Sequence, residues 1–167
     1  PYYEARTYRE DGLAKGKAAH PALTTAYEGT LSGIAELDAA LSQFLRARDA
    51  ERIEKYRKAG HTDAANVVNA MQIADHFSSA VIEKNVAEAD RLLPSLEAAL
   101  VELRKSEQAM KPDAGNKPEF SQISGYLNSM VGAWRDYKQK ADDSKRERII
   151  DQYNSAVEQM NNVEFPA

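Results

Sequence analysis

The stretch that decides the fold is residues 21–60, PALTTAYEGTLSGIAELDAALSQFLRARDAERIEKYRKAG. Its large apolar side chains recur at steps of three and four residues, the spacing of one face of an α-helix. These side chains are Leu23, Tyr27, Leu31, Ile34, Leu37, Leu41 and Phe44. The pattern predicts one long helix up to about Ala59 with this face turned inward. Gly60 is suited to end it, because glycine readily takes the left-handed conformation after a last helical turn.

The start of this helix carries two opposing signals. Asp11 can act as its N-cap, because an aspartate side chain accepts a hydrogen bond from an orphan backbone N–H. Pro21 lacks an N–H and crowds the carbonyl four residues back, which costs about 3 kcal/mol inside a helix. We therefore expect a kink or a short break at His20 and Pro21, with the longer helix restarting there.

Two further helices are expected before the middle of the chain ends. Thr62 or Asp63 can cap a second helix that ends at Asn85, and a third covers about Ala87–Met110 with Pro94 near its first turns. The side chains expected on their inner faces are Val67, Met71, Ala74, Phe77, Ser78, Val81, Leu92, Leu93, Leu96, Leu100 and Leu103.

The clearest loop is Lys111–Pro118, which combines proline, aspartate, glycine and asparagine. A fourth helix follows it, and a final helical segment closes the chain. Asp142–Lys145 lies between them and is either a turn or a solvated stretch of helix. The inner residues expected here are Phe120, Ile123, Leu127, Met130, Val131, Trp134, Tyr137, Ile149, Ile150, Tyr153, Val157 and Met160.

Length and composition indicate one folded domain over residues 1–167. Apolar residues make up 43% and charged residues 29%, the balance of a globular protein. The sequence has no alternating β-branched segment that would indicate a strand. Several amphipathic helices bury their apolar faces best against each other. We therefore predict an all-α, up-and-down bundle of about four to five helices.

Charge and cysteine content narrow the classes of function. The formal net charge is −4 without a basic block, so nucleic acid is not an expected partner. No apolar run approaches the roughly 20 residues of a transmembrane helix. The chain has no cysteine, which excludes disulfides, thiolate metal sites and a cysteine nucleophile.

The histidines and methionines do not form a recognisable cofactor site. His20, His61 and His76 fall in no Glu-x-x-His or His-x-x-x-His pattern, so paired ligands on one helical face are not expected. His76 is interpreted as a structural histidine, with a functional role as the alternative. The four methionines lie at core spacing and fit packing better than haem ligation. We predict no metal and no cofactor.

Glycine and serine patterns also favour structural roles. Gly12 and Gly16, and again Gly29 and Gly33, place small residues on one helical face, which lets two helices approach closely. No serine sits in a Gly-x-Ser-x-Gly elbow. Since no nucleophile, base and orienting group can be assembled from the spacing, we predict that the chain is not an enzyme.

Asn154 and Asn161 are seven residues apart, so a helix places them on one side. Buried asparagines commonly fix helix register, and a polar cleft for a ligand is the sharper alternative. We expect both amides to face inward and to find partners.

The tyrosine-rich start forms a second pattern at the chain ends. Tyr2, Tyr3 and Tyr8 each have a large apolar ring to bury. We expect this segment to pack along the closing helix near Tyr153.

The two ends of the chain together resemble the YiiG-like family of bacterial lipoproteins, a helical domain of unknown function. The residues at the start that carry the resemblance are Tyr2, Tyr3, Tyr8, Asp11, Gly16, Lys17, His20, Leu23 and Tyr27. Those at the end are Ile149, Ile150, Asp151, Gln152, Tyr153, Asn154, Met160 and Asn161. The resemblance implies a domain on the periplasmic or outer side of a bacterial membrane, tethered only through a lipid anchor upstream of the chain. A signal segment and a lipid-carrying cysteine would then precede Pro1, with simple trimming as the alternative.

The leading functional hypothesis is a non-enzymatic cell-envelope module that presents a helical surface to another envelope protein. The alternative is a carrier that holds a small or lipid-like ligand between helices. A continuous apolar groove beside Trp134 would favour the carrier, and a packed interior with an exposed apolar patch would favour the protein-binding module. The residues proposed to line a ligand or partner surface are Tyr2, Tyr3, Tyr8, His20, Trp134, Tyr153, Asn154 and Asn161.

Overall fold

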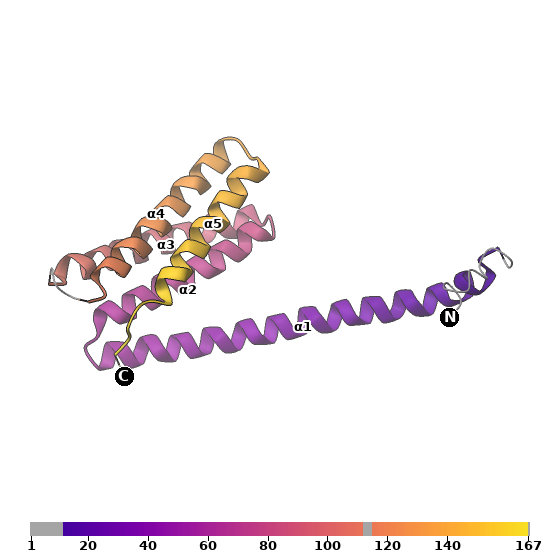
Figure 1. Cartoon of the computed structure of the whole chain (residues 1–167), viewed down its shortest axis with the longest axis horizontal. Helices are drawn as coiled ribbons and strands as arrows, with labels where there is room; N and C mark the ends of the chain where they lie inside the picture. Colours follow the sequence, from indigo (N-terminus) through magenta and orange to yellow (C-terminus); the bar gives the residue numbers. More distant parts are fainter. Residues whose placement is uncertain (1–11, 112–114, 167) are drawn as a thin grey trace. The chain divides into compact units, whose positions relative to one another are not determined.

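A computed structural model describes residues 12–111 and 115–166 of the chain. Within these residues the structure contains five α-helices and no strand (Figure 1). The helices are α1 (Ala14–Lys58), α2 (Thr62–Ile82), α3 (Val86–Ala109), α4 (Lys117–Gln139) and α5 (Asp143–Met160). The predicted all-α fold is confirmed.

The chain divides into two compact units, Pro1–Leu45 and Arg46–Ala167. The described residues of the first unit include most of α1, up to Leu45. The second contains the end of α1 and all of α2 to α5. The bundle described below belongs to the second unit, and a single domain over residues 1–167 stays a prediction.

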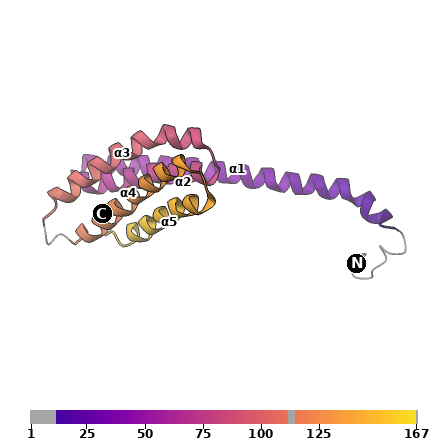
Figure 2. The same ribbon diagram turned by 90° about the horizontal axis from the view of Figure 1, so that it is seen from above.

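Helices α2 to α5 form a closed four-helix bundle. Each helix packs on the next along the chain, and α5 returns to pack on α2. Figure 2 views the bundle from above and shows α3 and α5 on opposite sides of it. Short connections between antiparallel neighbours give the up-and-down arrangement that amphipathic helices favour.

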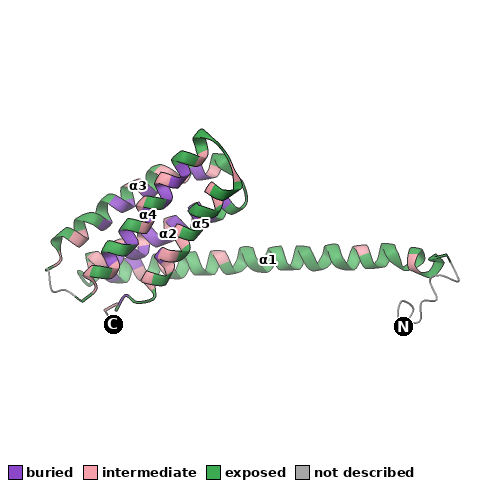
Figure 3. Ribbon diagram, turned by 45° about the horizontal axis from the view of Figure 1, so that its top comes forward, coloured by how far each residue is buried: buried purple, intermediate pink, exposed green. Residues whose placement is uncertain are grey.

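The bundle core is made of the apolar faces that the sequence indicated. Figure 3 shows buried residues running along the inner sides of α2 to α5. The largest fully buried side chains include Trp134, Phe77, Phe120, Leu96, Leu103, Ile123, Leu127, Met130, Ile149 and Val67. Leu92, Leu93, Tyr137, Tyr153, Val157 and Met160 are partly buried against them. The predicted inner faces of these four helices are therefore confirmed.

Two helices end in the same hydrogen-bonded motif. At the end of α1, Gly60 has φ +81°, its N–H donates to the carbonyl of Arg57, and the N–H of His61 donates to that of Tyr56. This is the Schellman pattern, so the predicted role of Gly60 is confirmed. Lys84 ends α2 in the same way with φ +58°, which is a strained conformation for a lysine.

The helix starts agree only partly with the sequence. Asn85 caps α3, because its side chain accepts a hydrogen bond from the N–H of Glu88 at 3.1 Å. The N-cap of α2 is His61, without a side-chain cap, so the predicted capping role of Thr62 or Asp63 is wrong. When several polar residues are neighbours at a helix start, composition alone does not show which of them is the N-cap. Asp11 lies outside the described residues, and α1 begins at Ala14.

Proline positions show a second difference. Helix α1 continues through Pro21, so the predicted break there is wrong, while a kink stays a prediction. Pro94 lies inside α3 rather than in its first turns. Both prolines are exposed, so water can solvate the carbonyl that each leaves without a partner.

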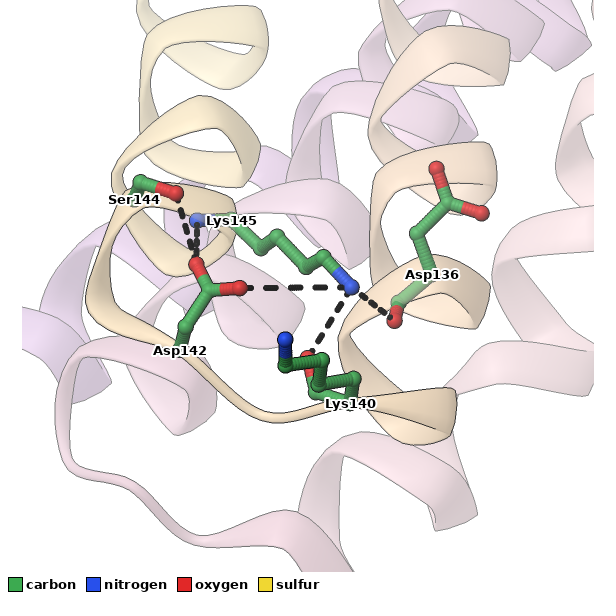
Figure 4. Close-up of polar contacts among 5 residues, drawn as sticks. All are labelled: Asp136, Lys140, Asp142, Ser144 and Lys145. Atoms are coloured by element: carbon green, nitrogen blue, oxygen red, sulfur yellow. Dashed lines mark hydrogen bonds and ion pairs between the residues drawn. The ribbon is translucent and has the colours of Figure 1, made fainter.

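The connection between α4 and α5 is a capped turn (Figure 4). Asp142 accepts hydrogen bonds from the N–H of Lys145 at 2.9 Å and from the hydroxyl of Ser144 at 2.6 Å. The ammonium of Lys145 donates to the carbonyls of Asp136 at 2.9 Å and Lys140 at 3.0 Å at the end of α4. The Asp136 carbonyl also accepts a hydrogen bond from the N–H of Lys140 at 3.2 Å. Of the two alternatives for Asp142–Lys145, the structure shows a turn at Asp142 and the first turn of α5 from Asp143.

The C-terminal residues are tied back to the bundle. The side-chain amide of Asn116 donates to the carbonyl of Glu164 at 2.7 Å and accepts from its N–H at 3.0 Å. The ring of Phe165 stacks on Tyr56 with centroids 5.8 Å apart, and the guanidinium of Arg52 lies 4.2 Å above the Phe165 ring. These contacts fix the last turns of α1 within the second unit.

Candidate partner-binding surface

A row of large apolar side chains runs along α1 and is here called the α1 stripe. It consists of Leu23, Tyr27, Leu31, Ile34, Leu37, Leu41 and Phe44, all of which are exposed. The exposed fraction is 69% for Leu23, 70% for Leu37 and 64% for Phe44. Figure 3 shows α1 coloured as exposed along nearly its whole length.

The sequence predicted that these side chains would face inward, and that prediction is wrong. Spacing of three and four residues shows that a helix has an apolar face, but it does not show what covers that face. The same spacing arises in a helix of a bundle and in a helix that meets another molecule.

The surroundings of the α1 stripe are weakly acidic. Between Ala22 and Leu45 the charged residues are Glu28, Glu36 and Asp38, without a lysine or arginine. A helix that lies on an anionic membrane surface carries basic residues on its polar face, so this charge pattern does not fit one.

Two hydroxyl groups next to the α1 stripe are bonded within the helix. Thr30 donates to the carbonyl of Ala26 at 2.8 Å, and Ser32 donates to the carboxylate of Glu36 at 3.3 Å. Because the Thr30 hydroxyl already has a partner, this position can turn its methyl group to an apolar neighbour without leaving a polar group unbonded.

Trp134, a candidate for the ligand or partner surface, lies in the bundle core instead. It is 2% exposed and packs edge-on against Phe77 and face-on against Tyr137, with centroids 5.4 Å away in each case. Its indole N–H donates to the carboxylate of Asp90 at 3.1 Å. The expectation that Trp134 forms a surface is not met, because a large aromatic side chain between three helices contributes most when it is buried.

Asp90 joins this tryptophan to the edge of the bundle. Its carboxylate also accepts a hydrogen bond from the ammonium of Lys138. That bond, together with the one from Trp134, lowers the pKa of Asp90 against the opposing effect of burial. The arrangement satisfies each polar group and ties α3 to α4, which is a structural role that sequence spacing did not indicate.

Tyr153 links α5 to α2 at a half-buried position. Its hydroxyl donates to the carboxylate of Asp75 at 2.8 Å. Burial raises the pKa of Tyr153 well above its usual range, and the hydrogen bond and negative charge of Asp75 add to this effect. Burial and Arg46 lower the pKa of the adjacent His76, against the charges of Asp75 and Glu88. The hydrogen bond between Tyr153 and Asp75 holds α5 and α2 together.

The two asparagines of the closing helix are on the outside. Asn154 is exposed on α5, and Asn161 is exposed at its C-cap, where its backbone N–H donates to the carbonyl of Val157. The prediction that both amides face inward is wrong. The buried side of α5 is set by Ile149 and Ala156, and Asn154 falls on a different face from these two.

The remaining candidates add nothing to a shared site. His20 is exposed on α1, and within residues 12–111 and 115–166 its side chain makes no hydrogen bond to the backbone near Pro21. Tyr2, Tyr3 and Tyr8, and their predicted packing near Tyr153, lie outside the described residues. Among the candidates in the second unit, Trp134 lies in the core whereas Asn154 and Asn161 are exposed, so these three do not form one site.

One comparison with known proteins places the chain in a family. The model of a family described as a protein of unknown function, DUF3829, matches residues 1–162. The chain belongs to DUF3829. No curated protein and no solved structure matches this DUF3829 chain.

In the described part of the DUF3829 chain, no group of three or more histidine, aspartate or glutamate side chains is placed to hold a metal ion. No helix among these residues has the length and apolarity needed to cross a bilayer. The absence of a metal and of a cofactor from the functional protein stays a prediction.

Proposed function

We propose that this DUF3829 chain is a non-enzymatic module that binds a protein partner through the α1 stripe. The observation that carries the proposal is an exposed apolar face on α1 together with a bundle whose own interior is packed. Folded proteins rarely expose large continuous apolar surface unless it meets another molecule.

The size of the α1 stripe supports this proposal. From the exposed fractions of its seven side chains, its open surface amounts to about 800 Å². The largest apolar patch of a typical monomer is about 300–600 Å². A protein–protein interface of standard size buries about 800 Å² on each partner. The stripe is therefore large for a solvent-facing surface and of the right size for an interface.

A carrier of a small ligand has less support. Trp134 is 2% exposed and is packed on two sides by aromatic rings, an environment that does not favour a carrier. A surface depression of about 460 Å³ lies between α2 and α3, lined by residues that include Asn66 and Ser106. These two side chains are hydrogen-bonded to each other at 2.9 Å, so each already has a partner within the chain.

The titratable groups support the non-enzymatic part of the proposal. Several described groups with a shifted pKa take part in helix-to-helix or cap contacts, such as Asp90 with Lys138 and Asp142 with Ser144. Glu88 and Arg91, whose pKa values are also shifted, form an exposed pair within α3. A catalytic site instead places such groups around a cavity where a substrate can reach them.

We also infer a place in the bacterial cell envelope, as the resemblance to YiiG-like lipoproteins implies. The protein would face the periplasm or the exterior and hold to the membrane through an upstream lipid anchor. The native gene should then encode a short apolar signal segment and a cysteine before the first residue of this chain. A cytosolic start without such a segment would contradict the envelope assignment.

The proposed function is tested by a pull-down from envelope extracts with the lipidated full-length protein. The test variant is Leu37→Glu with Leu41→Glu. The matched control is Ala35→Glu with Ala39→Glu, which adds the same charge to α1 at residues outside the α1 stripe. We expect proteins captured by the wild type to be lost with the test variant and kept with the control. Equal capture by all three proteins would contradict the proposal.

A further inference from the structure

The α1 stripe follows a seven-residue repeat. From Leu23 to Phe44, six of the seven stripe residues fall on the a and d positions of this repeat, with Tyr27, Ile34 and Leu41 at a. The preceding a position is His20. The residues at d are Leu23, Thr30, Leu37 and Phe44. A strict seven-residue repeat is the signature of a seam that faces another helix of the same period. Ile53 and Tyr56, which are buried in the second unit, fall outside this register.

The positions that flank the seam suit a close helix pair. On one side, at g, lie Ala19, Ala26, Gly33 and Ala40, which are small enough to let a second helix approach. On the other side, at e, Leu31 and Leu45 widen the apolar face. Asp38 is the one acidic or basic residue at these positions between residues 19 and 45. Two identical faces would therefore meet without like charges along most of their length.

The same stretch is poorly suited to remain a lone helix. It contains Pro21, Gly29 and Gly33, and each lowers helix stability in an interior position. Most helices gain their stability from packing of an apolar face rather than from propensity. A helix with these residues would therefore be stabilised if its exposed apolar face packed against a second helix.

The area of the face also fits pairing with itself. Two copies meeting through their stripes would bury up to about 1,600 Å² in total, the standard size of a stable interface. A second copy of the chain has the matching period and length, and it carries no charge pattern that would exclude it.

We propose that two copies of this chain pair through the α1 stripe as a two-helix coiled coil. This inference rests on the proposed function and names its partner as a second copy. It predicts that the chain is a dimer in solution, and that α1 gains helical order as the dimer forms.

Analytical ultracentrifugation of the full chain over a range of concentrations tests the pairing. The wild type should be dimeric at tens of micromolar. Leu37→Glu with Leu41→Glu should weaken dimerisation by about tenfold or more, since these changes place charge at d and a. Ala35→Glu with Ala39→Glu, at the outer b and f positions, should leave the dissociation constant within about twofold.

A pair of glycine variants tests the close approach without adding charge. An added Cβ meets nothing within 4 Å in a single chain at either Gly29 or Gly33, so a side chain fits the monomer at both positions. Gly29→Gln, at the outer c position, should keep or strengthen the dimer. Gly33→Gln, beside the seam, should weaken the dimer relative to Gly29→Gln, because a long side chain would stand where the small residues at g let the helices approach. At a concentration that keeps the chain monomeric, far-ultraviolet circular dichroism should give these two glutamine variants equal helical content.

The outcomes separate this inference from the proposed function. A wild type that stays monomeric to about 100 µM overturns the pairing. A dimer that survives Leu37→Glu with Leu41→Glu overturns it as well. If the wild type is monomeric but the envelope pull-down still depends on the stripe, the pairing falls and the protein-binding proposal stands. If neither measurement depends on the stripe, both fall.

Discussion

Two phenylalanines summarise the difference between the bundle and the first part of α1. Phe77 is completely buried in α2, whereas Phe44 is 64% exposed in α1. Both lie on helical faces with apolar residues three and four positions apart, so their local sequence patterns are alike. The difference teaches that helical periodicity identifies an apolar face. It does not identify the surface that packs against that face, because this depends on the other apolar faces in the same chain.

The largest expected effect comes from removing each ring in turn. Phe77→Ala should lower the free energy of unfolding by about 3–5 kcal/mol, because it leaves a cavity among packed helices. Phe44→Ala, measured at a concentration that keeps the chain monomeric, should change it by less than about 0.5 kcal/mol. Urea unfolding followed by circular dichroism compares the two. Similar losses for both would break the comparison, since Phe44 would then belong to a core.

The second prediction concerns the two left-handed residues that end α1 and α2. Gly60→Ala should lower the free energy of unfolding by about 1–2 kcal/mol, because φ +81° is strained for a residue with a Cβ. Lys84→Gly should raise it by up to about 1 kcal/mol for the same reason, since φ is +58° there. Gly29→Ala, inside the exposed part of α1, is the control, because it changes helix propensity at a residue that is not in the left-handed conformation. A stabilising Gly60→Ala would show that the end of α1 is not fixed in the Schellman pattern.

The third prediction compares two tyrosines. Tyr153→Phe removes the hydrogen bond to Asp75 and should lower the free energy of unfolding by about 0.5–1.5 kcal/mol. Tyr27→Phe on the α1 stripe should leave it almost unchanged. The folded pKa of Tyr153 is raised, so its contribution is fully present below about pH 10 and is lost as the pH rises through the folded pKa. The decline of stability above pH 10 should thus be shallower in Tyr153→Phe than in Tyr27→Phe, and equal slopes would contradict the bond.

The smallest expected effect concerns the cap at Asp142. Hydrogen bonds from Ser144 and from the N–H of Lys145 lower the pKa of this carboxyl. A lowered folded pKa gives stability that is present above the unfolded value of about 4 and lost as the pH falls through the folded value. Melting temperatures between pH 2 and pH 6 should therefore fall less steeply toward acid in Asp142→Asn than in the wild type. Asp38→Asn in α1 should keep the wild-type slope, and identical slopes for both variants would contradict a cap at Asp142.

Much of the bundle could be predicted from the sequence. The inner faces of α2 to α4 follow directly from residues such as Val67, Leu100 and Leu127, because helical spacing and strong apolar character coincide there. Gly60 was also predictable, since few residues other than glycine tolerate the conformation that ends a helix in this way. These features depend on local sequence, which a single chain carries in full.

The candidate surface could be predicted only in part. The α1 stripe was recognisable as an apolar face, but nothing local distinguishes a face covered by the same chain from one that is left open. The heptad register and the uncharged positions beside it were signals that could have pointed to a second helix. Asn154 was predicted to face the core but is exposed. Its seven-residue spacing to Asn161 shows that both lie on one side of a helix, but it does not show whether that side faces the core. Trp134 was assigned to the core and to a surface at once, and burial decided between them.

The central claim is that the α1 stripe belongs to an interface and not to the core of one chain. Hydrogen exchange measured by mass spectrometry tests it most directly. At submicromolar concentration, amides of residues 22–45 should exchange at least about a hundredfold faster than those of α2 and α4. They should slow as the concentration rises in the wild type, and stay fast in Leu37→Glu with Leu41→Glu. Exchange in residues 22–45 as slow as in α2 and α4, at every concentration and in this variant, would contradict the claim.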